Sequence, residues 1–145
     1  MDQTTVAVGS DHAGPEFKDQ LIAYLRQKGF AALDFGIPAG TERANYPDVA
    51  RKVAEAVARG EAQFGILICG TGLGMAMVAN KTPGVRAAPC VNEFMAEMAR
   101  AHNDANVLAL GVRVIGPGLA HAIVDRFLSV SFAGGRHAER LALFS

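Results

Sequence analysis

The stretch from residue 64 to residue 69, Phe-Gly-Ile-Leu-Ile-Cys, most constrains the fold, because no polar side chain interrupts it. A strand with one wet face alternates apolar and polar residues, whereas a strand covered on both faces is continuously apolar. Similar short runs span residues 4–9, 30–35, 85–91 and 107–110, and helix-like segments separate them. This alternation predicts an α/β chain in which helices cover both faces of a parallel sheet.

The expected helices carry apolar residues three and four positions apart, as a helix with one buried face does. They are the segments around residues 17–28, 49–59, 73–80, 93–100, 119–127 and 136–143. Residues 36–47 are rich in Gly, Pro and Thr and are expected to form a loop. If the strand order is 2-1-3-4-5, the turns that follow the first and third strands are neighbours. Ligands of open α/β sheets bind at such a point.

Length and composition restrict the protein class. The 145 residues fit one domain, 1–145, and half of them are hydrophobic while 19% are charged, which excludes a disordered chain. The 14 basic residues balance the 14 acidic ones, so we expect neither nucleic acid nor a membrane as partner. Two cysteines make no disulfide scaffold, and Met-Asp-Gln-Thr-Thr begins no signal peptide. We therefore expect a cytoplasmic protein.

The turn after the third strand reads Gly70-Thr71-Gly72-Leu73-Gly74. Alternate glycines let backbone N–H groups converge on an anion, either a phosphate or a reaction oxyanion, although a tight turn without a ligand is equally compatible. No Gly-Lys-Ser/Thr follows, as a Walker loop requires, and Met75 stands where a dinucleotide fingerprint has its last glycine. No residues have metal-ligand spacing, so we expect no cofactor and no metal.

Cys69 opens this turn. A cysteine that ends an apolar strand is usually a small buried hydrophobic residue. Beside a helix N-terminus, however, its thiolate is favoured and can act as nucleophile or general base. Cys90 has only Ala88, Pro89 and Val91 around it in the sequence, and it is interpreted as structural.

Polar residues gather near two further strand ends. Asp11-His12 follows the first strand, and His102-Asn103-Asp104 precedes the fifth, where it could equally form a simple turn. The other candidates are the basic residues Arg113, Arg136 and Arg140. Arg136 and Arg140 share a helix face, so they form either a solvated surface or a clamp for a phosphate dianion.

Several segments together resemble one family. They are Gly9-Ser10-Asp11-His12-Ala13-Gly14, the segment Gly65–Gly74, Ala79-Asn80-Lys81, the segment Ala101–Leu108 and Gly134-Gly135-Arg136-His137. In this order they resemble the type B ribose-5-phosphate isomerases, within the larger group that includes galactose-6-phosphate isomerase subunits. The resemblance extends from about Thr4 to Leu143.

The resemblance implies a Rossmann-like three-layer α/β/α sandwich with a five-stranded parallel sheet. It further implies a homodimer or tetramer whose active sites lie at the interface. The implied reaction is a metal-free and cofactor-free aldose–ketose isomerisation of ribose 5-phosphate to ribulose 5-phosphate, with the phosphosugar as the small-molecule partner.

The family's roles can be assigned to matching positions. The resemblance makes Cys69 the base, Thr71 and His102 the groups that open the sugar ring, and the Gly70–Gly74 backbone, including Gly72, the enediolate hole. It assigns sugar contacts to Asp11, Asn103 and Tyr46, and phosphate contacts to His12, Arg113, Arg136 and Arg140. The partner chain is expected to supply His102, Asn103 and Arg113, and the C-terminal helix at about 136–143 to contribute to the phosphate site or the dimer.

Two alternatives stay open. The same mechanism could act on allose 6-phosphate, galactose 6-phosphate or a tetrulose phosphate, with the loop Gly36–Tyr46 and walls near Met75 and Phe94 setting the allowed length. A non-catalytic module that binds sugar phosphates would need the glycine turn and the arginines but no thiolate.

Overall fold

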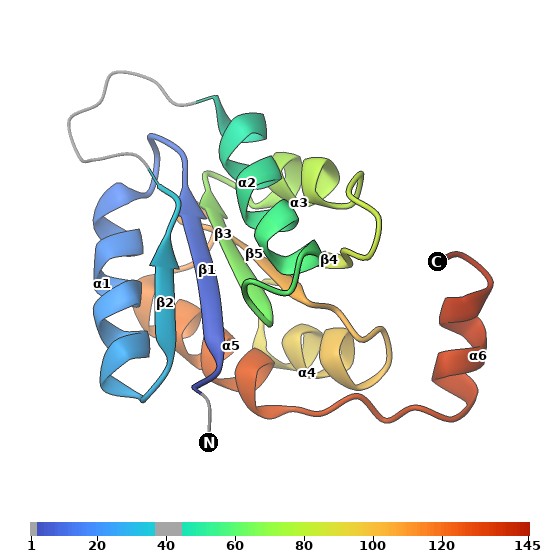
Figure 1. Cartoon of the computed structure of the whole chain (residues 1–145). Coiled ribbons are helices and arrows are strands. Elements are labelled where there is room, and N and C mark those ends of the chain that lie inside the picture. Colours follow the sequence, from blue (N-terminus) through green and yellow to red (C-terminus); the bar gives the residue numbers. More distant parts are fainter. Residues whose placement is uncertain (1–2, 37–44) are drawn as a thin grey trace.

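The computed structural model describes residues 3–36 and 45–145, which form an α/β/α sandwich around a five-stranded sheet (Figure 1). All strand pairs are parallel. The strands are β1 (Thr5–Ser10), β2 (Ala31–Asp34), β3 (Phe64–Cys69), β4 (Ala87–Pro89) and β5 (Val107–Gly111). The predicted fold class is confirmed, and each expected strand forms within a few residues of its expected bounds.

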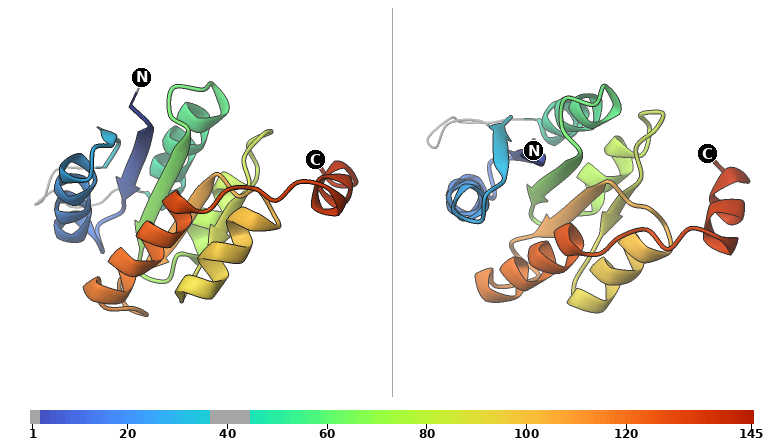
Figure 2. Two further views of the ribbon diagram at one scale, coloured as in Figure 1. Left: turned by 90° about the horizontal axis from the view of Figure 1, so that it is seen from below. Right: turned by 60° about the horizontal axis from the view of Figure 1, so that its bottom comes forward.

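The helices are α1 (Pro15–Gln27), α2 (Tyr46–Ala58), α3 (Leu73–Ala79), α4 (Glu93–Ala101), α5 (Pro117–Ser129) and α6 (Arg136–Ala142). Helices α1, α4 and α5 pack on one face of the sheet, and α2 and α3 on the other (Figure 2). Most of the expected loop, residues 37–44, lies outside the described residues. The loop ends earlier than expected, because α2 begins at Tyr46 with Pro47 in its first turn, where a proline costs no hydrogen bond.

The strand order is β2-β1-β3-β5-β4, so the expected order 2-1-3-4-5 is wrong at its last two strands. Strand β5 is buried at all five positions and occupies the interior of the sheet beside β3. Strand β4 has three half-buried residues and ends in Pro89, which has no N–H to donate. Such a strand suits an edge, and the expected neighbourhood of β1 and β3 is confirmed.

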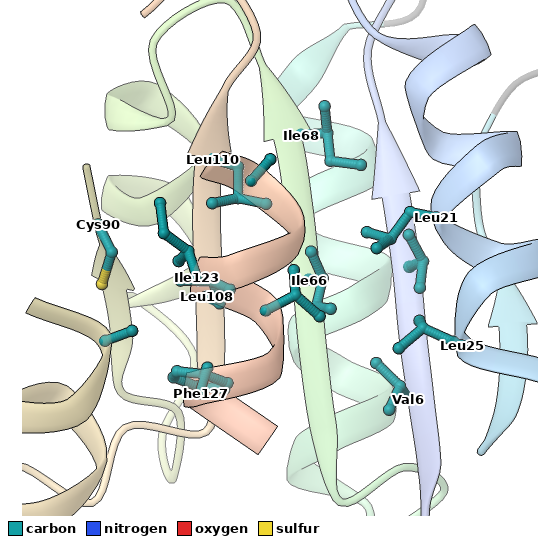
Figure 3. Close-up of a cluster of buried hydrophobic side chains, with 14 of the residues drawn as sticks. Val6, Leu21, Leu25, Ile66, Ile68, Cys90, Leu108, Leu110, Ile123 and Phe127 are labelled. Atoms are coloured by element: carbon teal, nitrogen blue, oxygen red, sulfur yellow. The ribbon is translucent and has the colours of Figure 1, made fainter. Parts of the chain in front are cut away.

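Two apolar layers hold the sheet. The first packs Val6, Ile66 and Leu108 of the strands against α1, α4 and α5, and includes Phe127 and Cys90 (Figure 3). The second packs Leu67 and Ala109 against α2 and α3. The carboxyl ends of β1, β3 and β5 are therefore fixed from both faces, and the turns that follow them begin from rigid positions.

Helix α6 stands apart from the sandwich at the end of an extended segment, residues 130–135 (Figure 1). Its His137 and Leu141 are buried, whereas Leu143 and Phe144 beyond it are 87% and 67% exposed. A helix that buries so little against its own chain leaves an apolar end without cover. None of the helices in the described residues is both long and apolar enough to span a lipid bilayer.

Candidate active site

The turns after β1 and β3 lie side by side at the carboxyl edge of the sheet. Ser10 pairs with Ile68 in the ladder, and the Asp11 N–H donates to the Ile68 carbonyl at 3.1 Å. The Asp11 carboxylate is largely buried and its Oδ1 accepts the Ala13 N–H at 2.8 Å, while His12 next to it is exposed. The predicted neighbourhood of Asp11, His12 and Cys69 at this edge is thus confirmed.

The sulfur of Cys69 lies at the base of the glycine turn. The residue is 6% exposed, and its sulfur accepts the Gly72 N–H at 3.1 Å. Gly72 has φ +83°, a left-handed conformation that side-chain-bearing residues rarely adopt. The Gly72 N–H is therefore aimed at the sulfur, where it would stabilise a negative charge.

Two backbone N–H groups of the turn donate hydrogen bonds to side chains of the turn itself. The Leu73 N–H donates to Thr71 Oγ1 at 3.2 Å, as the Gly72 N–H donates to Cys69. Within residues 3–36 and 45–145, the N–H groups of Thr71 and Gly74 donate no hydrogen bond to the protein. The donors available to an oxyanion are therefore fewer than the whole Gly70–Gly74 backbone that the sequence suggested.

Two residues from other segments, Gly111 and Tyr46, pack against the turn. A Cβ atom on Gly111 of β5 would lie 2.6 Å from the Thr71 carbonyl carbon, so the backbones of these two segments are in direct contact. The Tyr46 ring packs on Gly74, and Tyr46 remains 42% exposed. Tyr46 therefore borders the turn, and the sugar contact that the resemblance implies for it stays a prediction.

Arg113 also belongs to this edge. Its side chain lies against Gly70, with Cδ 3.5 Å from the position of a Cβ there, and its N–H donates to the Gly70 carbonyl at 3.1 Å. The expectation that Arg113 is supplied by a partner chain is therefore not needed, because the guanidinium already reaches the turn of its own chain. Met75, expected as a wall of the site, is fully buried in the second apolar layer.

A second group of predicted residues lies at the amino ends of the strands, opposite to the end of the sheet that carries Cys69. His102 follows α4 and precedes β5, whose other end, Gly111, pairs with Cys69. The five residues of β5 alone span about 13 Å at roughly 3.3 Å per residue. His102 and Asn103 of one chain therefore cannot meet Cys69 of the same chain.

The helix α6 lies with this second group. The rings of His102 and His137 stack at 4.1 Å between centroids and 11° between planes. Burial lowers the pKa of the His137 imidazole, and the positive charges of His102, Arg136 and Arg140 lower it further. His102, Asn103, Arg136 and Arg140 thus form one basic half-site, separate from the Cys69 half-site.

A cavity of about 800 Å³ opens beside the second group, between the β4 region and the C-terminus. Asn103, Cys90 and Phe144 are among its lining residues, and Cys69 is not. The cavity therefore does not join the two half-sites.

Sequence reasoning missed the contributions of Gly111 and His137. Gly111 is the last residue of a buried strand, and only its distance from Thr71 shows why a side chain is excluded there. His137 belongs to the segment Gly134–His137, which carries part of the family resemblance, but nothing in the sequence connects it to His102, because an extended segment brings the two rings together.

Similarity to known proteins identifies the family of this chain. The model of the ribose/galactose isomerase family matches residues 6–144. The chain belongs to this family. It is 46% identical over 136 residues to ribose-5-phosphate isomerase B of Escherichia coli (strain K12), covering 94% of this chain and 91% of the relative. It is 44% identical over 137 residues to D-erythrulose-4-phosphate isomerase of Pectobacterium atrosepticum, covering 94% and 90%.

Solved structures with a similar fold belong to the same family. Ribose-5-phosphate isomerase B of Clostridium thermocellum superposes with a TM-score of 0.94 at 51% identity, covering 97% of this chain and 94% of the other. The type B ribose 5-phosphate isomerase of Trypanosoma brucei gives 0.91 at 45% identity, covering 98% and 97%. The resemblance seen in the sequence is confirmed, and the chain is a sugar-phosphate isomerase of this family.

Proposed function

We propose that this protein interconverts ribose 5-phosphate and ribulose 5-phosphate through an enediolate, with Cys69 as the base and without a metal or cofactor. The observation that carries the proposal is the position of the Cys69 sulfur, which lies 3.1 Å from the Gly72 nitrogen. The same turn has further backbone N–H groups, those of Thr71 and Gly74, that donate to no protein group within the described residues. The Escherichia coli relative, named for this reaction, supports the choice of sugar.

The proposed chemistry is a proton transfer between two neighbouring carbons. The Cys69 thiolate removes the proton from C2 of the open aldose, and the electron pair moves onto the carbonyl oxygen at C1. Free N–H groups such as those of Thr71 and Gly74 bind the resulting oxyanion, and a single such donor contributes roughly 3–4 kcal/mol elsewhere. The thiol then returns the proton to C1, and a proton shift between the oxygens leaves the ketose.

Two chains are needed to complete this site. Because His102 and Asn103 lie at the edge opposite Cys69, we propose that a second copy supplies them across the interface of a homodimer. The exposed Leu143 and Phe144 and the open cavity beside them support a second copy, since apolar surface of this kind is stabilised by burial. Whether two dimers form a tetramer, and a cytoplasmic location, stay predictions.

The remaining roles concern the ring and the phosphate. His102 and Thr71 are proposed to move the protons that open the furanose, and Asp11, Asn103 and Tyr46 to hold the sugar hydroxyls. The basic residues proposed for the phosphate are His12, Arg113, Arg136 and Arg140. Binding energy from a phosphate remote from C1 and C2 holds these carbons at the base.

The base assignment is tested by Cys69→Ala, with Cys90→Ala as the matched control at the other cysteine. We expect Cys69→Ala to lose nearly all turnover while it still binds the sugar phosphate in calorimetry. Cys90→Ala, which keeps the turn intact, retains turnover. A Cys69→Ala protein with most of its kcat would disprove the role of Cys69 as base.

The shared site is tested by mixing. Homodimers of Cys69→Ala or His102→Ala are each expected to be inactive, whereas a mixed dimer contains one site with both wild-type residues. We expect up to half of the wild-type activity per mixed dimer. Absence of rescue in dimers verified by mass spectrometry would show that each chain forms its site alone.

A second candidate substrate is a four-carbon ketose phosphate, favoured by the relative from Pectobacterium atrosepticum named for D-erythrulose 4-phosphate. The mechanism is unchanged, because the same two carbons react. A panel of aldose and ketose phosphates with four, five and six carbons separates the candidates by kcat/KM. A higher kcat/KM for a sugar other than ribose 5-phosphate would reject the first choice of substrate and keep the mechanism.

A further inference from the structure

The turn that carries His102 and Asn103 has an unusual backbone. Asp104 has φ +46°, and it is the single non-glycine residue with a positive φ in the described part of the chain. Aspartate tolerates this conformation better than most residues. The Asp104 N–H donates to the Arg100 carbonyl at 3.3 Å and the Ala105 N–H to the Ala99 carbonyl at 2.8 Å, so the turn closes the end of α4.

Two arginines hold the Asp104 side chain. Its Oδ1 accepts Arg100 Nη1 at 3.0 Å, and its Oδ2 accepts Arg86 Nη2 at 3.3 Å. Arg86 also donates from Nε to the Asp104 backbone carbonyl at 3.2 Å. Carboxylate and main chain are thus fixed together, directly beside the two proposed site residues.

Arg100 extends this connection to the segment that leads to α6. It is largely buried, with its guanidinium over the Phe64 ring at 5.0 Å from the centroid. Its Nε donates to the Val130 carbonyl at 3.2 Å, and its Nη1 donates to the Ala105 carbonyl at 2.6 Å. The Ala133 N–H adds a hydrogen bond to the Ala101 carbonyl at 2.9 Å.

We propose that Asp104, with Arg100 and Arg86 bound to it, forms a set of positioning residues, which fixes the His102–Asn103 turn relative to the start of α6. This inference rests on the proposed function, because it requires His102 to act on the sugar ring. None of these three residues touches the substrate in this scheme. They act by holding His102, stacked on His137, at a fixed place beside the phosphate-binding arginines.

The test compares two reactions of the whole homodimer. Isomerisation of ribose 5-phosphate needs the ring opened, whereas ribulose 5-phosphate has no free 5-hydroxyl and cannot close a furanose ring. Exchange of its C1 hydrogen with solvent deuterium therefore needs proton abstraction by Cys69 but no ring opening. The ratio of isomerisation rate to exchange rate reports on ring opening and is insensitive to a general loss of folded protein.

The variants are Asp104→Asn, which keeps a residue that tolerates positive φ but loses the charge, and His102→Ala as reference. Displacements near 1 Å can cost about 100-fold in rate, so we expect the ratio to fall at least about tenfold in Asp104→Asn. Arg86→Gln, which leaves the buried Arg100 in place, lowers it at least about threefold on the same grounds. Glu55→Gln, which breaks the exposed 3.5 Å ion pair to Arg59, leaves it unchanged.

Three outcomes decide the matter. A ratio that falls in His102→Ala, Asp104→Asn and Arg86→Gln supports positioning. A ratio that falls in His102→Ala and stays at wild-type value in the other two overturns positioning alone. A ratio unchanged in His102→Ala overturns the ring-opening role of His102 and this inference with it.

Discussion

Gly111→Ala is expected to damage the Cys69 half-site without changing any polar group. The added Cβ would lie 2.6 Å from the Thr71 carbonyl carbon and 2.7 Å from Thr71 Cα and its carbonyl oxygen. Ordinary contact begins at 3.4 Å, so the two backbones must separate by about 0.8 Å. Since all three atoms belong to the main chain, no side-chain rotation relieves the overlap.

The size of the effect follows from this displacement. Overpacking of this kind costs about 1–3 kcal/mol, which lowers Tm by roughly 3–10 °C in a domain of this length. Thr71 lies between Cys69 and Gly72, so the shift moves the donor at the sulfur and the free N–H groups. Displacements near 1 Å reduce catalysis by up to about 100-fold, and we expect kcat to fall by about 10- to 100-fold.

The assay is steady-state isomerisation combined with thermal unfolding, and Gly118→Ala is the matched control. Gly118 is in α5 and a Cβ there meets nothing within 4 Å. The control is expected to gain roughly 0.5–1 kcal/mol, because alanine loses less entropy in a helix, and to keep its kcat. A Gly111→Ala enzyme with wild-type kcat and Tm would refute the contact between β5 and the turn as a constraint on catalysis.

Three further changes have defined outcomes. Arg136→Ala and Arg140→Ala should each raise KM for the sugar phosphate more than they lower kcat, and an unchanged KM in both would identify α6 as a solvated helix. Phe127→Ala removes a fully buried ring that packs edge-on to a second aromatic ring, so it should cost about 3–5 kcal/mol in urea unfolding, and a loss below about 1 kcal/mol would contradict its place in the core. Burial raises the pKa of Cys90 to about 11, above its value of about 8.5 in an unfolded chain, so the folded state holds this proton longer. Stability should therefore fall as the pH rises from about 8.5 to 11, and Cys90→Ala should flatten that slope in unfolding experiments at several pH values.

Much of the half-site around Cys69 could be predicted from local sequence. Residues 64–69 form a doubly covered strand, and the alternate glycines after it produce the left-handed turn at Gly72. The neighbourhood of Asp11 followed from the expected pairing of the first and third strands. These features depend on patterns within a few residues or on a general rule of parallel sheets.

For the half-site around His102, the sequence predicted which residues take part but not how they are arranged. Its residues were chosen by resemblance, and their grouping with His137 depends on contacts between segments about 30 residues apart, whereas Arg100 and Asp104 are close to His102 in the sequence. The alternative interpretation of residues 102–104 as a simple turn was also partly right, because Asp104 does shape a turn.

The sequence by itself determined the elements of this protein, because hydrophobic periodicity and glycine placement act over one helix or one strand. It also determined the α/β class, since parallel strands require helical crossovers. Only the tertiary structure decided that β5, and not β4, lies beside β3, because this order depends on how much apolar surface each of the two strands can bury. The same packing sets His102 and Cys69 at opposite ends of one sheet, a separation that no local pattern encodes.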